Sequence, residues 1–415
     1  MKTATKKDAD EKASRESFSR RVYVDNNATT SVAPEVLEAM LPYLGDFYGN
    51  PSSAHWFGRS VRSRVEEARE HLAALIGADD PSEIVFCASG SESDNMAVKG
   101  SATNHPQDGS WQVVNSAIEH PAVFNTVKYL GKNGYRRKII GVDKYAIVNP
   151  DGVKAALDDK TAVVSIMHGN NEVGVLQDIK KIAAAVKNKG ILMHTDAVQS
   201  AGKVPIDVND LGVDLLSFSA HKLHGPKGVG ALYIRKGAKI HPLITGGHHE
   251  RGRRAGTENV PGIVGFGKAC EIAKKRMADD SSHIAALRDE LQKRILGEIP
   301  YVRLNGHPEK RLPTTLNVSI ESVEGETMMI QCDMNGIALS TGSACSSGSL
   351  DPSHVLIAMD IPHEIIHGSL RFSFGHDNTM EDVDYIMRKL PKIVETTRAI
   401  SPLWGTNGPI PIEDL

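Results

Sequence analysis

Short apolar runs alternate with helix-like segments through most of the chain, and this alternation restricts the fold more than any other feature. The apolar runs are EIVFCA (83–88), WQVVNSAI (111–118), AVVSIMHG (162–169), ILMHTDAV (191–198), LLSFSA (215–220) and GALYI (230–234). The segment 59–77, before the first run, has apolar residues at helical spacing and ends on Gly77, a residue that stops helices well. Strands that alternate with helices indicate βαβ units and a mainly parallel sheet that is covered on both faces.

The last third of the chain has a different character. A long charged helical stretch (about 262–297) is followed by the β-runs TLNVSI, GIALST and LRFSF. Because 415 residues exceed the usual domain size of roughly 100–200 residues, we expect two packed lobes, of which the second is a smaller α+β lobe.

Charge and composition narrow the possible partners. The formal net charge is -3 and no apolar run approaches the ~20 residues of a membrane span, so we expect neither nucleic acid nor a membrane as a partner. Cys87, Cys270 and Cys332 stand in apolar surroundings, which predicts that they are small core residues. The four cysteines show no CxxC pair and no metal-ligand spacing, which favours a reducing, cytoplasmic compartment and predicts no bound metal.

A lysine and an aspartate stand at the ends of two predicted strands. Lys222 leaves the run LLSFSA and enters a Gly/Pro loop. A lysine that forms a Schiff base needs such a semi-enclosed position, where its pKa can fall. Asp196 ends the run ILMHTDAV, at the edge where α/β folds place their sites, and could pair with a cofactor ring nitrogen. Each residue also has a simpler interpretation. Lys222 could be a solvated loop lysine, and Asp196 could be a helix N-cap.

Two further features could complete a cofactor site. Ser89–Glu92 joins the run EIVFCA to a predicted helix, and a turn of small residues at a helix N-terminus suits a phosphate. His120 follows the run WQVVNSAI and could stack on a planar cofactor or move protons near neutral pH. Taken singly, these features indicate a capped turn and a loop histidine. The ordered set with Asp196 and Lys222 is much more specific.

At this point the sequence shows a resemblance to a known family. The chain closely resembles the NifS/IscS-type cysteine desulfurases, in the same motif order, over roughly residues 22 to 403. The motifs are VDNNATT (24–30), YGNPSSAH (48–55), SESDN (91–95), IEHPAV (118–123), MHGNNEVG (167–174), HTDAVQS (194–200), SFSAHKLHGPKG (217–228), GRRAGTENV (252–260) and TGSACSSGSL (341–350).

The resemblance implies a pyridoxal-phosphate (PLP) enzyme of fold type I that works as a homodimer. Such a fold has a large domain with a mainly parallel seven-stranded sheet between helices, plus a smaller α+β domain. We expect the large PLP-binding domain over 32–265 and the small domain over 22–31 together with 266–415. Residues 1–21 carry charges of both signs and lack an apolar core, which predicts a disordered tail.

The resemblance also assigns roles by position. Lys222 matches the Schiff-base lysine, Asp196 the partner of the pyridine nitrogen, and His120 the stacking residue. Other cofactor contacts are assigned to Asn171, Gln199, Gly90, Ser91, Ser219 and His221, with Thr257 supplied across the dimer interface. Arg371 looks like the clamp on the substrate carboxylate, because an arginine fork can donate two parallel hydrogen bonds, and Asn171 is assigned as a second substrate contact.

Cys345 lies in a small, polar run that is typical of an exposed loop. The resemblance makes it the nucleophile that takes sulfur from L-cysteine, which leaves alanine and a persulfide on Cys345. Lys222 would be the base for the substrate proton, and His120 would serve later proton transfers. The persulfide would then pass to an iron–sulfur scaffold or another sulfur acceptor protein.

Other functions stay open at this point. A selenocysteine lyase or an aminotransferase of the same fold would use the same cofactor, although an aminotransferase has no need of Cys345. The run His363–His367 is a literal HExxH, the zinc-hydrolase pattern, but Gly368 follows at once and no third ligand is evident. A non-catalytic sulfur-transfer scaffold would not need Lys222, Asp196 and Cys345 together.

The chain departs from its relatives in places that bear on function. The phosphate turn is SGSES where relatives commonly have GATES, and the serine keeps the hydroxyl. After Arg371 the run ends FSFGH, so His376 stands where many relatives carry arginine. The C-terminal tail is shorter than in the IscS branch, where this region docks an iron–sulfur scaffold, and this leaves the acceptor open.

Overall fold

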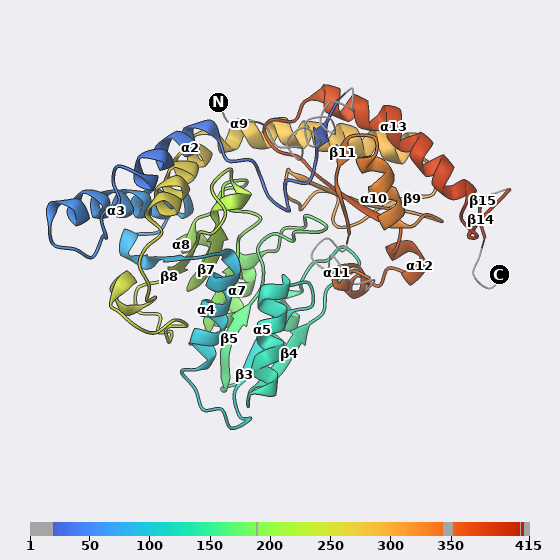
Figure 1. The fold of residues 1–415 in the computed structure, drawn as a ribbon. Coiled ribbons are helices and arrows are strands. Elements are labelled where there is room, and N and C mark those ends of the chain that lie inside the picture. Colours follow the sequence, from blue (N-terminus) through green and yellow to red (C-terminus); the bar gives the residue numbers. More distant parts are fainter. Residues whose placement is uncertain (1–19, 188–189, 343–351, 407, 411–415) are drawn as a thin grey trace.

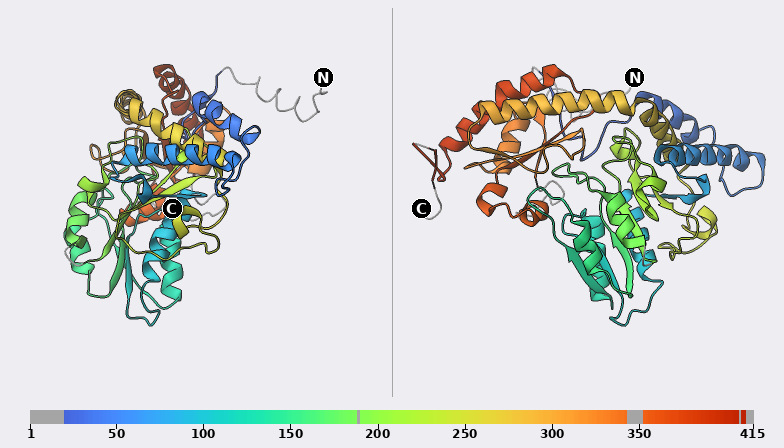
Figure 2. Two further views of the ribbon diagram at one scale, coloured as in Figure 1. Left: turned by 90° about the vertical axis from the view of Figure 1, so that its left-hand side faces the viewer. Right: turned by 180° about the vertical axis from the view of Figure 1, so that it is seen from behind.

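The computed structural model describes residues 20–187, 190–342, 352–406 and 408–410. These residues form two lobes that share one long helix along their upper edge (Figure 1). The view from behind shows the same helix running from one lobe to the other (Figure 2).

The larger lobe is built on a seven-stranded sheet in the order β2-β8-β7-β6-β5-β3-β4. The strands are β2 (Ile84–Cys87), β3 (Gln112–Ser116), β4 (Arg136–Ile140), β5 (Thr161–Ser165), β6 (Leu192–Asp196), β7 (Leu215–Ser219) and β8 (Gly230–Ile234). Only β8 runs antiparallel to its neighbours, while the pairs between β7 and β4 are all parallel. The predicted mainly parallel, seven-stranded sheet is confirmed.

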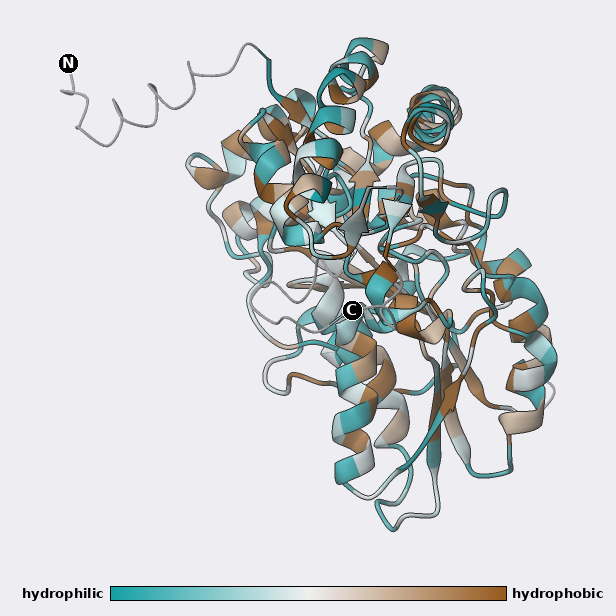
Figure 3. Cartoon of the chain, turned by 90° about the vertical axis from the view of Figure 1, so that its right-hand side faces the viewer, coloured by the Kyte–Doolittle hydropathy of each residue, from teal (hydrophilic) through white to brown (hydrophobic). Residues whose placement is uncertain are grey.

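Helices cover both faces of this sheet. Two neighbouring residues of β3 show this. Val113 packs in one apolar cluster with α4 (Gly90–Ala102) and α5 (Pro121–Lys132). Val114 packs in another cluster with α3 (Trp56–Ile76), α7 (Ile179–Lys187) and α9 (Val260–Glu298). The helices of this lobe are α2 (Pro34–Met40), α3 (Trp56–Ile76), α4 (Gly90–Ala102), α5 (Pro121–Lys132), α6 (Pro150–Ala156), α7 (Ile179–Lys187) and α8 (Val208–Leu211). The 3-10 turns are η1 (Leu41–Leu44), η2 (Pro81–Glu83), η3 (Ala220–Lys222) and η4 (His249–Gly252). In Figure 3 the helices carry alternating hydrophobic and hydrophilic stretches, as expected for helices with one face on a core.

Gly77 ends α3 as predicted. It adopts φ 68° and ψ 30°, the left-handed conformation that closes many helices and that glycine adopts without steric cost. At the other end, the side chain of His55 accepts a hydrogen bond from the backbone of Gly58.

The smaller lobe has an antiparallel sheet in the order β12-β13-β10-β9. Its strands are β9 (Val302–Leu304), β10 (Thr315–Ile320), β12 (Ser340–Thr341) and β13 (Ser369–Ser373). The N-terminal strand β1 (Val22–Tyr23) pairs in parallel with β11 (Ile337–Ala338), so the first described residues pack in the smaller lobe. The helices of this lobe are α10 (Gly325–Asp333), α11 (His354–Ala358), α12 (His363–Ile366) and α13 (Met380–Ala399), and β14 (Trp404–Gly405) pairs with β15 (Gly408–Pro409).

The long helix α9 (Val260–Glu298) contributes to both cores. Its first part, through Cys270, packs in the core of the large lobe, and its second part, from Ile284, packs in the core of the small lobe. The domain boundary expected between residues 265 and 266 falls inside this continuous helix, and the division into domains stays a prediction.

Other expectations concern the termini and the cysteines. Cys87, Cys270 and Cys332 are buried, as predicted. The predicted tail, 1–21, lies outside the described residues except for its last two, of which Arg20 forms ion pairs with Glu381 and Asp382. Within the part of the chain that the structure describes, no helix combines the length and the apolar character needed to cross a membrane.

Candidate active site

A cavity of about 290 Å³ lies at the carboxyl ends of the parallel strands. It is lined by almost all of the residues predicted to bind cofactor or substrate, which come from both lobes. These are Gly90, Ser91, His120, Asn171, Asp196, Gln199, Ser219, His221, Lys222 and Arg371. The arrangement follows from the fold, because polar residues at the ends of adjacent parallel strands meet at one edge of the sheet.

Lys222 ends the 3-10 turn η3, directly after β7. Its Nζ donates hydrogen bonds to the backbone oxygens of Asn27 at 2.6 Å and Ala28 at 2.7 Å. Gln199 donates to the same Asn27 oxygen at 2.9 Å. The N-terminal segment therefore orients this half-buried lysine at the cavity.

Asp196 is the last residue of β6 and is only 4% exposed. One of its oxygens accepts a hydrogen bond from the backbone N–H of Val198 at 2.8 Å, so the local capping interpretation is partly correct, although the segment that follows is a turn and not a helix. Burial raises the pKa of Asp196 to about 6, against the opposing effects of the Val198 hydrogen bond and the charge of Lys222. A cationic donor placed beside this carboxylate would favour its ionised form.

A second carboxylate, which the sequence reasoning missed, lies next to Asp196. Asp94 is 1% exposed, and its Oδ1 has no hydrogen-bond partner among the described residues, although Nε2 of His194 lies 3.7 Å away. Burial and the neighbouring charge of Asp196 raise its pKa well above the ordinary range. Asp94 falls in the motif SESDN, but a polar residue in the first turns of a helix gave no signal that it faces a site.

The opposite end of the cavity is suited to an anion. Ser89 is the N-cap of α4 and accepts a hydrogen bond from the backbone of Glu92 at 3.1 Å, so the capped turn and the site coexist. Gly90 opens the helix, and a Cβ at this position would come within 2.9 Å of the Val198 side chain, which shows how closely the backbone is packed here. The exposed N–H groups of a helix N-terminus and the hydroxyl of Ser91 favour a phosphate at this point.

His120 is the N-cap of α5, where its Nδ1 accepts a hydrogen bond from the backbone of Ala122 at 3.1 Å. Burial, with a contribution from the charge of Lys222, lowers the pKa of His120 to about 4. The ring is therefore neutral at pH 7, with its remaining proton on Nε2. A neutral ring can stack on a flat cofactor without adding charge.

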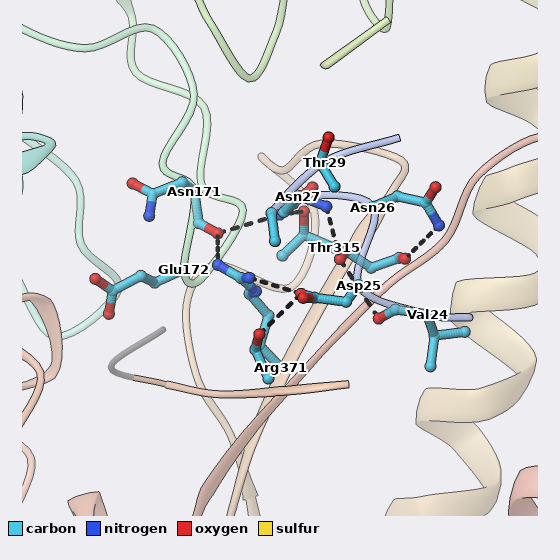
Figure 4. Close-up of polar contacts among 12 residues, drawn as sticks. Val24, Asp25, Asn26, Asn27, Thr29, Asn171, Glu172, Thr315 and Arg371 are labelled. Carbon is cyan, nitrogen blue, oxygen red and sulfur yellow. Dashed lines mark hydrogen bonds and ion pairs between the residues drawn. The ribbon is translucent and has the colours of Figure 1, made fainter. Parts of the chain in front are cut away.

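Arg371, on β13, brings the small lobe into the cavity. Its guanidinium donates to the backbone oxygen of Asn171 at 3.0 Å and to Oδ1 of Asp25 at 2.8 Å (Figure 4). Asn27 donates to the same Asn171 oxygen at 3.1 Å, so three segments that are distant in the sequence meet at this oxygen.

Two predicted residues are not part of this geometry. Thr257 is exposed and does not line the cavity of its own chain. Cys345 lies outside the described residues.

The HExxH run does not gain support as a zinc site. Its helix, α12, has four residues, and His363 and His367 are both exposed. Neither histidine belongs to a cluster of three possible metal ligands in the described part of the chain.

The cavity as a whole has the donor set for a flat, aromatic cofactor with a phosphate at one end. The N-terminus of α4 with Ser91, Ser219 and His221 would hold the phosphate. The buried carboxylate of Asp196, whose pKa is raised by burial, would meet a protonated ring nitrogen. Lys222 lines the same cavity and could bond to such a cofactor.

Comparisons with known proteins agree with this geometry. The family model for class V aminotransferases matches residues 22–386. A cysteine desulfurase IscS from Methanosarcina thermophila is 50% identical over 384 residues, which cover 92% of this chain and 94% of that protein. A solved NifS-like protein superposes with a TM-score of 0.85 at 41% identity, covering 91% of this chain and all of the other. A solved structure described as SspA in complex with cysteine has a TM-score of 0.76 and 35% identity, covering 86% and 100%.

The fold, the cavity and these similarities lead to one assignment: the chain belongs to the class V aminotransferase family, within its NifS/IscS-type cysteine desulfurases.

Proposed function

We propose that this protein removes sulfur from L-cysteine with the help of PLP, and that it stores the sulfur as a persulfide on Cys345. The observation that carries the proposal is the single cavity that contains Lys222, Asp196, the N-terminus of α4 and Arg371. Lysine, buried carboxylate, phosphate cradle and carboxylate clamp are the parts that amino-acid chemistry on PLP requires.

When bound, PLP would act as an electron sink that stabilises negative charge at the substrate Cα. Asp196 would keep the ring nitrogen protonated, and His120 would cover the ring face. Arg371 would bind the substrate carboxylate and so fix which bond of the substrate faces Lys222. Lys222 would take the Cα proton and return a proton to the product.

The sulfur step balances without an external oxidant. The thiolate of Cys345 attacks the substrate sulfur, an S–S bond forms, and the substrate C–S bond breaks. The electron pair of that bond stays with the substrate carbon, which takes a proton and becomes the methyl group of alanine. The substrate carbon is reduced while the sulfurs of the persulfide are oxidised, so the sum is cysteine plus enzyme thiol to alanine plus enzyme persulfide.

We further infer a homodimer in which Thr257 reaches the phosphate site of the partner subunit. This is consistent with the exposure of Thr257 and its absence from the cavity of its own chain. Because Cys345 must return to the thiol form after each transfer, the proposal also favours a reducing compartment such as the cytoplasm. The acceptor would be an iron–sulfur scaffold or another sulfur-carrying protein.

The test is an absorption spectrum of the protein loaded with PLP, before and after L-cysteine, with alanine and sulfide measured under reducing conditions. The visible band of the lysine-bound cofactor should be lost in Lys222→Ala, whereas Lys227→Ala, an exposed lysine of the same loop, should keep it. Cys345→Ala should keep the band and lose sulfide release. Wild-type protein that shows the band but forms no alanine from cysteine would contradict the proposed function.

A further inference from the structure

Two histidines and an aspartate meet at the junction of the two lobes, outside the cofactor cavity. His224 lies just after the turn that carries Lys222, while His376 and Asp377 follow β13. Nδ1 of His376 lies 2.9 Å from Nε2 of His224, and Nε2 of His376 lies 3.1 Å from Oδ1 of Asp377. One nitrogen from each ring and the carboxylate oxygen all lie within 4.8 Å of one another.

The hydrogen bonds of His224 show which of its two ring nitrogens lacks a proton and could bind a metal ion. Nδ1 of His224 lies 3.2 Å from the backbone oxygen of Ser31, and since a carbonyl oxygen can only accept, Nδ1 must carry the proton. Nε2 of a neutral ring then carries no proton, and it accepts the 2.9 Å hydrogen bond that Nδ1 of His376 donates. A histidine whose far nitrogen donates to a backbone carbonyl is the usual arrangement of a metal-bound imidazole.

The spacing of the nitrogens also suits an ion. Two nitrogens bound at right angles, each about 2.1 Å from a metal, lie about 3 Å apart, and a tetrahedral site needs only a few tenths of an ångström more. An ion would replace the proton that now joins Nδ1 of His376 to Nε2 of His224, and their 2.9 Å separation means that the rings would have to move little. The carboxylate of Asp377 contacts the other nitrogen of His376, Nε2, and most of this side chain is solvent-exposed. It would have to turn towards the ion to complete a set of two imidazoles and one oxygen, and the three ligand atoms lie within 4.8 Å of one another.

The backbone holds His224 in place. Its φ is +63°, in the left-handed region that side chains other than glycine seldom occupy, and such strain is commonly found at functional sites. Its backbone N–H donates to the hydroxyl of Thr30 at 2.9 Å, and its oxygen accepts from the N–H of Ala33 at 3.0 Å. The three possible ligands also line a second cavity of about 290 Å³, which gives an ion a path of entry and leaves room for water ligands.

The geometry points to a divalent transition-metal site formed by His224, His376 and Asp377, for an ion such as Zn²⁺, Co²⁺ or Ni²⁺. Such an ion would connect the loop after Lys222 to the strand end after Arg371, and thus the two lobes. The site does not depend on the sulfur chemistry, and it gives a role to the histidine that stands where many relatives carry arginine.

The experiment is a titration of the PLP-loaded protein with Co²⁺, followed by its visible d–d absorption and by metal analysis after gel filtration. All variants carry Cys345→Ala, so that this thiolate cannot bind the metal. We expect one tightly bound Co²⁺ per chain. In His376→Arg, which restores the common residue of the relatives and should fold, the affinity should fall at least about tenfold. His224→Ala should give the same loss and Asp377→Asn a smaller one, while the PLP absorption band confirms that each variant is folded.

The control variant is His363→Ala, which removes a histidine of the HExxH run and should leave Co²⁺ binding unchanged. Absence of Co²⁺ binding in the parent protein, or full binding in His376→Arg, would overturn the inference. Loss of binding in His363→Ala would do so too, and would assign the metal to the HExxH run.

Discussion

Nη2 of Arg371 lies 2.8 Å from Oδ1 of Asp25, although the two residues are 346 positions apart in the chain. Arg371 is 1% exposed, and its other terminal nitrogen donates to the backbone of Asn171. The guanidinium is therefore oriented by two acceptors before any substrate arrives. A substrate carboxylate would meet a preformed fork and would not have to order a mobile side chain.

Arg371→Lys should raise KM for L-cysteine at least about tenfold, because an ammonium group lacks the planar fork that binds a carboxylate with two hydrogen bonds. The absorption band of bound PLP should stay the same, since Arg371 is not proposed to hold the cofactor. Steady-state kinetics measures KM, and the absorption spectrum shows whether PLP is bound. Arg388→Lys, on the exposed side of α13, is the control and should change neither. An unchanged KM in Arg371→Lys would rule out the clamp.

A buried ion pair should make a large contribution to stability. Arg69 on α3 forms two hydrogen bonds with Glu250 on η4, at 2.7 and 2.8 Å, and the side chains of both residues are 3% exposed. Glu250→Gln would leave the guanidinium without its buried counter-charge and should lower the free energy of unfolding by about 3 kcal/mol. Urea unfolding at fixed PLP concentration measures this.

The matched control for that change is an exposed pair. Lys180 and Asp210 are more than 60% exposed, so Asp210→Asn should cost less than about 1 kcal/mol. If both variants lost the same free energy of unfolding, burial would not be the reason for the stabilising effect of the Arg69–Glu250 pair.

Local sequence patterns predicted much of this fold. They could not predict the contacts between segments that are distant in the sequence. The parallel strands and the helix that ends at Gly77 follow from the spacing of apolar residues and from backbone chemistry, both of which are local. The reversed direction of β8 could not be predicted, because GALYI is as apolar as its parallel neighbours. The contacts of Arg371 with Asp25 and of Lys222 with Asn27 depend on where the N-terminal segment lies in space. Sequence spacing does not encode that position.

Gly230, which belongs to none of the predicted site residues, packs directly against the turn at the phosphate end of the cavity. A Cβ on Gly230 would lie 2.5 Å from the carbonyl carbon of Ser89 and 2.8 Å from the backbone nitrogen of Gly90. Because these are backbone atoms, Gly230→Ala should displace the turn and lower PLP affinity at least about tenfold. Equilibrium dialysis with PLP measures the dissociation constant. Gly141→Ala, where the new methyl group meets nothing within 4 Å, is the control, and equal affinity in both variants would contradict the prediction.

Glu119 should make stability depend on pH. Its side chain is fully buried, the hydroxyl of Ser116 and the N–H of Met167 both donate to Oε1, and Oε2 has no hydrogen-bond partner among the described residues. Burial raises the pKa of Glu119 to about 8, despite the opposing effect of these hydrogen bonds. The folded protein thus keeps a proton that the unfolded chain releases at about pH 4.5.

A group whose pKa is raised on folding stabilises the fold fully below its unfolded pKa, and this stability is lost as the pH rises towards the folded pKa. Glu119→Gln removes this dependence. The free energy of unfolding of the glutamine variant should therefore improve relative to wild type between about pH 5 and about pH 8, by up to ~1.4 kcal/mol per pH unit. Paired urea titrations across this range give the difference at each pH. A difference that stays constant, or that falls as the pH rises, would contradict the prediction, because folding would then not raise the pKa of Glu119.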